Sequence, residues 1–92
     1  MDTLIDKFSK QMNNELRANE SKGDFVSGWN PTPYELTAEI AWHMAKLNKA
    51  LADVIENDCH ENRLKIDEYS ADIANYMAKM SQCYGTLGKN LK

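Results

Sequence analysis

Two rows of polar side chains in this sequence could carry chemistry, and both repeat at helical spacing. The first row consists of Glu35, Glu39, His43 and Lys46. The second row consists of Glu68, Asp72, Asn75 and Lys79. Residues three or four positions apart share one face of a helix, so each row follows one line along a helix surface. If the two helices pair in antiparallel fashion, their middles meet, and the first row comes to face Asp72 and Asn75.

The first chemistry that fits these rows is a magnesium site. Mg²⁺ prefers oxygen ligands in an octahedral arrangement, and the phosphates of a bound nucleotide can complete its shell. The candidate ligands are four carboxylates, those of Glu35, Glu39, Glu68 and Asp72. A zinc site is not expected, because the two histidines lie far apart and the two cysteines lack the spacing of zinc ligands.

The second chemistry is an anion site without a metal. His43 and Lys46 would contact phosphate, and Asp72 and Asn75 would hold a base or a ribose. An aromatic ring, that of Tyr69 or Trp29, would stack on the ligand. The third interpretation is a solvent-facing helical surface that carries salt bridges and binds nothing. The spacing alone leaves all three open.

Three helices must position these rows, and we expect them at about residues 3–21, 33–55 and 60–84, with a tail at 85–92. Thr32, Pro33 and Glu35 form a strong start for the second helix, as N-cap, first residue and capping-box partner. Asp58 to Glu61 has a second capping-box pattern, and Gly85 should end the third helix. Trp42 is expected to pack beside the apolar stripe of the second helix. No segment alternates at period two for long enough to form a strand.

The expected fold is therefore all-α: one three-helix domain over residues 1–92. The second and third helices form a long antiparallel hairpin, and the first helix packs across it. With 92 residues the chain can build only a modest core, so oligomerisation is expected.

Composition excludes several classes of protein. A net charge of −3 argues against a sequence-independent nucleic-acid binder, which needs a basic surface. No run approaches the ~18 apolar residues of a membrane span. The first ten residues lack the pattern of a secretion signal. Two cysteines without close pairing are typical of free thiols in a reducing cytosol, so we expect a cytoplasmic protein.

The order of KG, GW, TPYEL, EIAWHMAKLNKAL and EYSADIANYMAKM resembles the MazG-like all-α nucleotide pyrophosphohydrolases, especially small phage-encoded versions. The similarity runs from about residue 22 to 80, and its most specific part is ADIAN at 71–75. The resemblance implies an enzyme that cleaves nucleoside triphosphates between the α and β phosphates. It also implies Mg²⁺ held by ExxE on one helix and ExxD on the next, in a dimer or tetramer.

The chain departs from this pattern at the residues that hold the metal. The two ExxE positions fall on His43 and Lys46. The ExxD positions fall on Tyr69 and Asp72, and of the four only Asp72 keeps a carboxylate. Glu39 and Glu68 could substitute only in a rearranged site. A lysine and a histidine in place of carboxylates should repel Mg²⁺ and attract phosphate directly, so no cofactor is expected.

The resulting hypothesis is a catalytically impaired nucleotide-binding protein, in which Lys22 and Trp29 close the pocket. Its expected binding residues are Lys22, Trp29, Glu39, His43, Lys46, Tyr69, Asp72 and Asn75. If it is phage-encoded, it would act in the infected cell as a sponge, sequestering a nucleotide or a nucleotide-derived immune signal as a counter-defence. One alternative is an active Mg²⁺-dependent nucleoside triphosphate pyrophosphohydrolase, and the other is a helical protein-interaction module.

Overall fold

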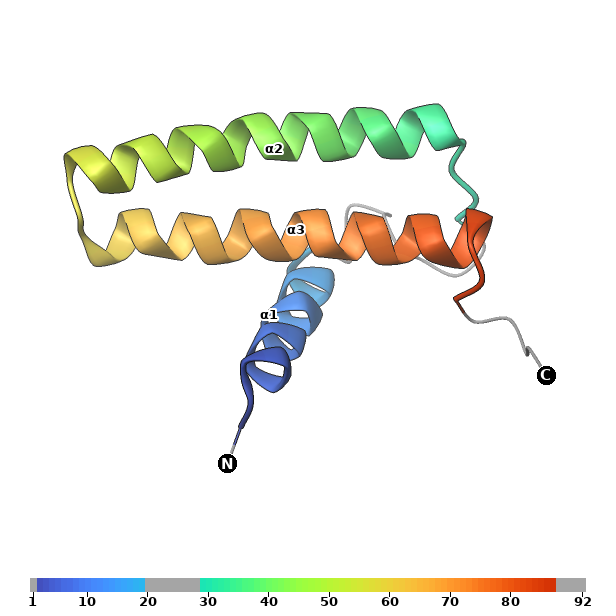
Figure 1. The fold of residues 1–92 in the computed structure, drawn as a ribbon, viewed down its shortest axis with the longest axis horizontal. Helices are drawn as coiled ribbons and strands as arrows, with labels where there is room; N and C mark the ends of the chain where they lie inside the picture. The colour runs from blue at the N-terminus through green and yellow to red at the C-terminus, as the bar shows by residue number, and fades with distance from the viewer. Residues whose placement is uncertain (1, 20–28, 88–92) are drawn as a thin grey trace.

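The computed structural model describes residues 2–19 and 29–87, and it shows three helices in chain order. α1 spans Leu4–Ala18, α2 spans Pro33–Glu56 and α3 spans His60–Tyr84. α2 and α3 lie side by side and run in opposite directions, joined by a short turn (Figure 1). No strand occurs in the described residues, so the all-α prediction is confirmed for that part of the chain. No helix there is long and apolar enough to cross a lipid bilayer.

The first two helices begin at side-chain caps, and the second of these is the predicted cap at Thr32. The Thr3 hydroxyl accepts from the Asp6 backbone N–H at 3.1 Å, and the Asp6 carboxylate accepts from the Thr3 N–H at 3.1 Å. The Thr32 hydroxyl accepts from the Glu35 N–H at 3.1 Å, with Pro33 in the first turn. Each such cap stabilises its helix by about 1 kcal/mol. Both helix starts are therefore fixed by local chemistry.

The start of α3 differs from the prediction. Cys59, not Asp58, is the N-cap residue, and its side chain makes no capping hydrogen bond. The Asp58 carboxylate instead accepts from Arg63 Nε at 2.5 Å and Nη2 at 2.8 Å. This hydrogen-bonded pair lowers the pKa of Asp58. The Asp58 carboxylate pairs with the guanidinium and not with a backbone N–H, because the guanidinium offers two charge-assisted hydrogen bonds in place of one bond to a neutral donor.

The end of α3 is set by a close backbone approach at Gly85. Its N–H donates to the Ser81 carbonyl oxygen at 2.9 Å, as the C-cap of the helix. A Cβ atom at this position would lie 2.9 Å from that same oxygen. The prediction that Gly85 ends the helix is confirmed, since any other residue would push the last turn apart.

A thin core lies between the two long helices and under α1. Leu36 and Ala71 are fully buried, and Ala50, Ile73 and Tyr76 are nearly so. At the open end of the hairpin, the Tyr84 hydroxyl donates to the buried Pro31 carbonyl oxygen at 2.6 Å, which ties the end of α3 to the segment before α2. Trp42, which was expected to pack, is 59% exposed. It lies about 120° around α2 from Leu36 and so points away from the core.

α1 packs against α3 and not against α2. In Figure 1 it crosses below α3 at a steep angle, on the side away from α2. The prediction that it packs across the hairpin is therefore corrected to packing on one helix of it. The tie is polar: the Asn75 side-chain amide, only 5% exposed, donates to the Met12 backbone carbonyl at 3.0 Å.

We expect Asn75→Ala to lower the free energy of unfolding by about 1–3 kcal/mol, because it removes a buried hydrogen bond between two helices. Thermal unfolding followed by circular dichroism measures the loss. Asn48→Ala is the matched control, since Asn48 is exposed on α2 and the two changes alter helix propensity equally. Equal melting temperatures for the two variants would contradict the proposed anchoring role.

Candidate functional site

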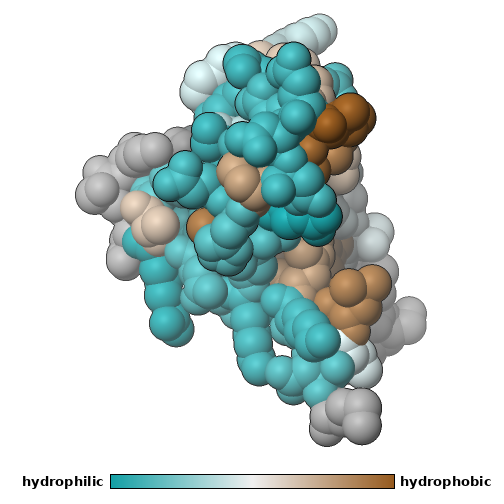
Figure 2. Space-filling model, turned by 90° about the vertical axis from the view of Figure 1, so that its left-hand side faces the viewer, coloured by the Kyte–Doolittle hydropathy of each residue, from teal (hydrophilic) through white to brown (hydrophobic). Residues whose placement is uncertain are grey.

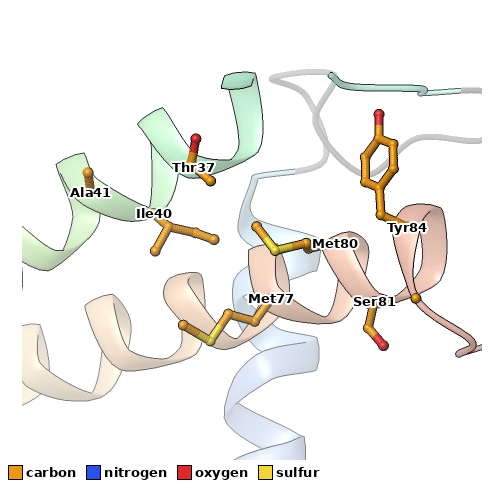
Figure 3. A pocket seen from close by; sticks show the side chains of 8 residues that line it. Thr37, Ile40, Ala41, Met77, Met80, Ser81 and Tyr84 are labelled. Carbon is orange, nitrogen blue, oxygen red and sulfur yellow. The ribbon is translucent and has the colours of Figure 1, made fainter. Parts of the chain in front are cut away.

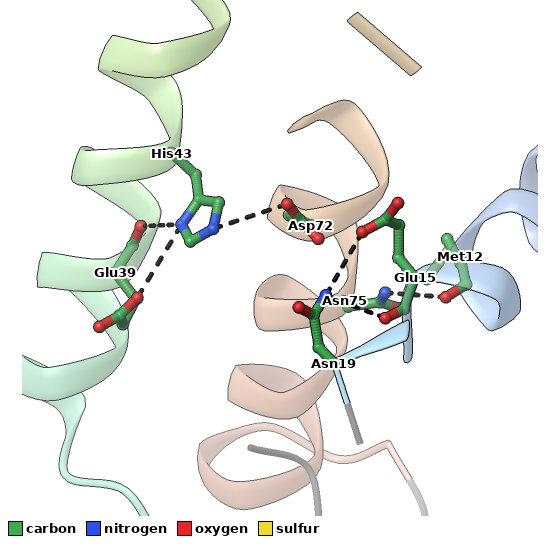
Figure 4. A network of polar contacts seen from close by, with 7 residues as sticks. All are labelled: Met12, Glu15, Asn19, Glu39, His43, Asp72 and Asn75. Carbon is green, nitrogen blue, oxygen red and sulfur yellow. Dashed lines mark hydrogen bonds and ion pairs between the residues drawn. The ribbon is translucent and has the colours of Figure 1, made fainter. Parts of the chain in front are cut away.

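The two predicted polar rows meet at His43 and Asp72. His43 Nε2 lies 3.6 Å from Asp72 Oδ2, and the side chains are 8% and 12% exposed (Figure 4). His43 Nδ1 lies 2.8 Å from the Glu39 backbone carbonyl, so this nitrogen carries a proton and donates. The Glu39 carboxylate lies 3.9 Å from the same nitrogen. Both ring nitrogens of His43 thus face oxygen atoms of the chain itself.

Lys46 lies one turn further along α2, between two aromatic rings. Its Nζ is 4.2 Å from the centroid of the Trp42 ring and 4.8 Å from that of Tyr69 on α3. An ammonium over an aromatic ring is attracted by the negative face of the ring's quadrupole. This attraction contributes about 0.5–2 kcal/mol, according to exposure. The side chain is therefore held across the hairpin.

A hollow of about 170 Å³ opens beside this lysine. It is lined by Lys46, Lys49, Ala50, Asp53, Lys65 and Tyr69. Lys49 Nζ lies 3.3 Å from Asp53 Oδ2, while Lys46 and Lys65 form no ion pair with another described residue. Three ammonium groups against one carboxylate make the hollow locally positive on a chain of net charge −3. Such a hollow suits an anion.

On the other side of Asp72, three carboxylates gather between α1 and α3. Oxygen atoms of Glu15, Glu68 and Asp72 lie within 4.8 Å of one another. Figure 4 shows the Glu15 side chain reaching from α1 toward Asp72, with the Asn19 amide donating to its carboxylate at 3.3 Å. Burial raises the pKa of Glu15 to about 7, and the charge of Asp72, a hydrogen bond with it, and the charge of Glu68 act in the same direction.

The structure brings together part of the predicted binding set. Glu39, His43 and Asp72 form one group across the hairpin, and Lys46 and Tyr69 form a second. The Trp42 ring, which was not in the predicted set, contacts both His43 and Lys46. Asn75 turns instead to α1. The Trp29 ring lies 6.4 Å from the Tyr76 ring, and Lys79 Nζ lies 5.5 Å from the Trp29 ring. Lys22 lies outside the described residues.

The four carboxylates predicted for Mg²⁺ do not form one cluster. Among the described residues, the only acidic group close enough to share an ion includes Glu68 and Asp72 but not the other two. The His43 ring stands between Glu39 and Asp72, and Glu35 is exposed in the first turn of α2.

Sequence reasoning gave no role to Lys65 and Glu15. Lys49 lies on the same polar face as the first row, three residues after Lys46, and Lys65 precedes Tyr69 by one turn, so helical spacing indicates both lysines. Glu15 follows Met12 by three residues and therefore interrupts the apolar stripe of α1, which is the signal of a polar group facing another helix.

No family model, curated protein or solved structure matches this chain. What the site can bind is therefore inferred from its own side chains.

The crowded carboxyl of Glu15 predicts a pH-dependent stability. Because its pKa is about 7 in the folded chain against 4.5 otherwise, the folded chain retains a proton that the unfolded chain loses. Stability should therefore fall as pH rises from about 4.5 to about 7 and then level off. Solvent screening limits the effect to the order of 1 kcal/mol.

Glu15→Gln should remove this dependence and raise the melting temperature at pH 8 by roughly 4–8 °C. Thermal melts at several pH values measure it. Glu56→Gln, which removes an exposed carboxylate from the end of α2, is the control for the loss of one charge. A Glu15→Gln variant with an unchanged slope between pH 4.5 and 7 would refute the assignment.

Proposed function

We propose that this protein binds a nucleotide-type ligand through its phosphates, without a metal ion and without hydrolysing it. The observation that carries the proposal is the basic hollow lined by Lys46, Lys49 and Lys65, with the Tyr69 ring in its wall. Ammonium groups form strong, charge-assisted hydrogen bonds with phosphate oxygens. The ring adds a surface on which the rest of the ligand can rest.

The predicted division of roles changes with this geometry. Lys46 keeps the phosphate contact proposed for it. His43 is buried, and its two nitrogens face the Glu39 carbonyl and Asp72, which suits a residue that positions the two helices. Its proposed contact with phosphate stays a prediction, as do the ligand contacts of Asn75, Trp29 and Lys22.

The resemblance to the MazG-like pyrophosphohydrolases supports the same proposal. In that pattern His43, Lys46 and Tyr69 stand where a metal-dependent enzyme has carboxylates. A cation at Lys46 would repel Mg²⁺ from this part of the hairpin and leave phosphate as the better ligand. A phage-encoded binder of this kind would serve to sequester a nucleotide or a nucleotide-derived immune signal in the host cytoplasm.

One observation favours a second candidate, an active Mg²⁺-dependent pyrophosphohydrolase. The cluster of Glu15, Glu68 and Asp72 offers three hard oxygen ligands within 4.8 Å of one another, which fits a divalent cation. Such an ion would polarise the phosphates of a bound triphosphate. The cluster includes Glu15 in place of the predicted ligands Glu35 and Glu39. It lies on the α1 side of Asp72, whereas the lysines of the hollow lie along α2 and α3.

Calorimetric titration with a panel of nucleotides and cyclic nucleotides, with and without EDTA, tests the first candidate. We expect binding that survives the chelator and weakens about tenfold or more in Lys65→Ala and in Lys46→Ala, since each loses a charged contact. Lys10→Ala removes the same charge from α1, where Lys10 pairs with Asp2, and should bind as the unaltered protein does.

Three results would count against the metal-free binder. The first is no binding by any member of the panel, and the second is binding that vanishes with EDTA. The third is pyrophosphate release in the presence of Mg²⁺, abolished by Asp72→Ala but not by Glu35→Gln, which would favour the enzyme.

We also propose that the protein self-associates through one side of the hairpin. A hollow of about 720 Å³ there is lined by uncharged residues: Thr37, Ile40, Ala41, Met77, Met80, Ser81, Tyr84 and Gly85 (Figure 3). Met77 and Tyr84 are each 52% exposed. Met44, Leu51 and Ile55 continue the uncharged line along α2, and all three are exposed. Seen from the turn end, hydrophobic residues gather along one side of an otherwise hydrophilic surface (Figure 2).

The uncharged hollow and the exposed side chains beside it offer a surface for a second copy of the chain. A stable interface buries about 800 Å² on each partner. A surface without charge can meet its own copy about a two-fold axis without like-charge repulsion.

Light scattering coupled to size exclusion tests the assembly. We expect a dimer or tetramer, and we expect Met77→Glu to give monomers, because it places a charge in the uncharged hollow. Leu64→Glu is the control, a 49% exposed residue of α3 that does not line the hollow. If the unaltered protein is monomeric at all concentrations, the surface is left for a different protein, as in the interaction-module alternative.

A further inference from the structure

The side chain of Trp42 lies in the open beside the basic hollow. It is 59% exposed, although an indole of this size gains about 1.5–3 kcal/mol when it is buried. It does not belong to the core, and its ring has two neighbours on α2. The Lys46 ammonium lies 4.2 Å from its centroid, and the His43 ring meets it edge-on at 5.0 Å and 85°. The ammonium lies over one face of the indole, and more than half of the side chain still stays open to solvent.

The register of α2 places this ring in line with the lysines of the hollow. Trp42, Lys46 and Lys49 stand at positions i, i+4 and i+7, which lie on one face of a helix. At a rise of 1.5 Å per residue, Trp42 and Lys49 are separated by about 10 Å along the axis. One surface strip therefore carries an aromatic platform at one end and a cluster of ammonium groups at the other.

The other aromatic rings of the site are less available to a ligand. Tyr69 shares the Lys46 ammonium with Trp42, at 4.8 Å from its centroid, but its side chain is only partly exposed. Trp29 is also only partly exposed and contacts the Tyr76 ring and Lys79. Of the three, Trp42 presents the largest open surface beside the hollow.

A platform and a cation cluster at this separation match the two ends of a nucleotide. A nucleobase stacked on an aromatic side chain contributes about 1–3 kcal/mol, and the larger ring system of a purine covers more of an indole. We propose that Trp42 stacks the base of a purine nucleotide whose phosphates bind Lys46, Lys49 and Lys65. This inference rests on the proposed function and adds the class of the ligand and the residue that selects it.

The test compares two probes that share a triphosphate: ATP, which also carries a ribose and a base, and inorganic tripolyphosphate, which carries neither. Calorimetry in EDTA gives the ratio of their affinities for the unaltered protein, for Trp42→Leu and for Trp42→Phe. We expect ATP to bind more tightly than tripolyphosphate, and this preference to fall about tenfold in Trp42→Leu. Trp42→Phe keeps an aromatic ring and should retain most of the preference for ATP over tripolyphosphate. For the unaltered protein, the preference for UTP over tripolyphosphate should be smaller than that for ATP.

The outcomes separate the two proposals. If tripolyphosphate binds and the ratio is the same in Trp42→Leu as in the unaltered protein, stacking on Trp42 is refuted while the anion site stands. The same holds if both probes weaken equally, because Trp42 would then act only by holding Lys46. If neither probe binds the unaltered protein, the stacking role of Trp42 is refuted, and the proposed function falls with it if no member of the nucleotide panel binds either.

Fluorescence gives a second readout that does not depend on folding of the leucine variant. The chain has two tryptophans, so in Trp29→Phe the emission comes from Trp42. We expect ATP to quench this emission and tripolyphosphate to leave it nearly unchanged. Equal responses to the two probes would overturn the stacking role.

Discussion

Asp72 is the point at which the three helices depend on one another. Its carboxylate is almost buried, and a charge removed from water must be compensated by partners. His43 approaches it from α2, and Glu15 and Glu68 crowd it from α1 and from its own helix. The His43 ring attracts it only when both ring nitrogens carry protons, and the two carboxylates repel it unless they carry a proton. Side chains of all three helices therefore meet at this one carboxylate.

The same junction divides the polar side of the molecule into two parts of opposite character. Toward α1 the oxygen atoms of three carboxylates lie together. Toward the turn of the hairpin, three lysines line a hollow, and one of them rests on two aromatic rings. The first part has the chemistry of a cation site and the second that of an anion site. The lysines carry the proposed function because two of them lack a carboxylate partner among the described residues, whereas the acidic side chains crowd each other.

Local sequence signals predicted the helices well, but they could not predict most contacts between helices. Thr32 and Pro33 set the start of α2 because a cap needs only residues within one turn. Asp58 matched the same kind of pattern but pairs with Arg63, a competitor five residues away that the capping motif does not include. The meeting of His43 with Asp72 could be foreseen, because an antiparallel pair joined by a short turn has one register. Glu15 could not be placed, since nothing in the sequence between α1 and α2 states which side of the hairpin α1 will touch.

The single contact surface of α1 has a consequence for the motions of the molecule. A helix that touches one neighbour can detach while the rest stays folded, because the contacts between α2 and α3 do not pass through it. Local opening of this kind needs less free energy than global unfolding, so we expect α1 to open before the hairpin does. The lysine hollow is lined by residues of α2 and α3 alone. The hollow proposed to bind a ligand should therefore keep its lining residues in place when α1 detaches.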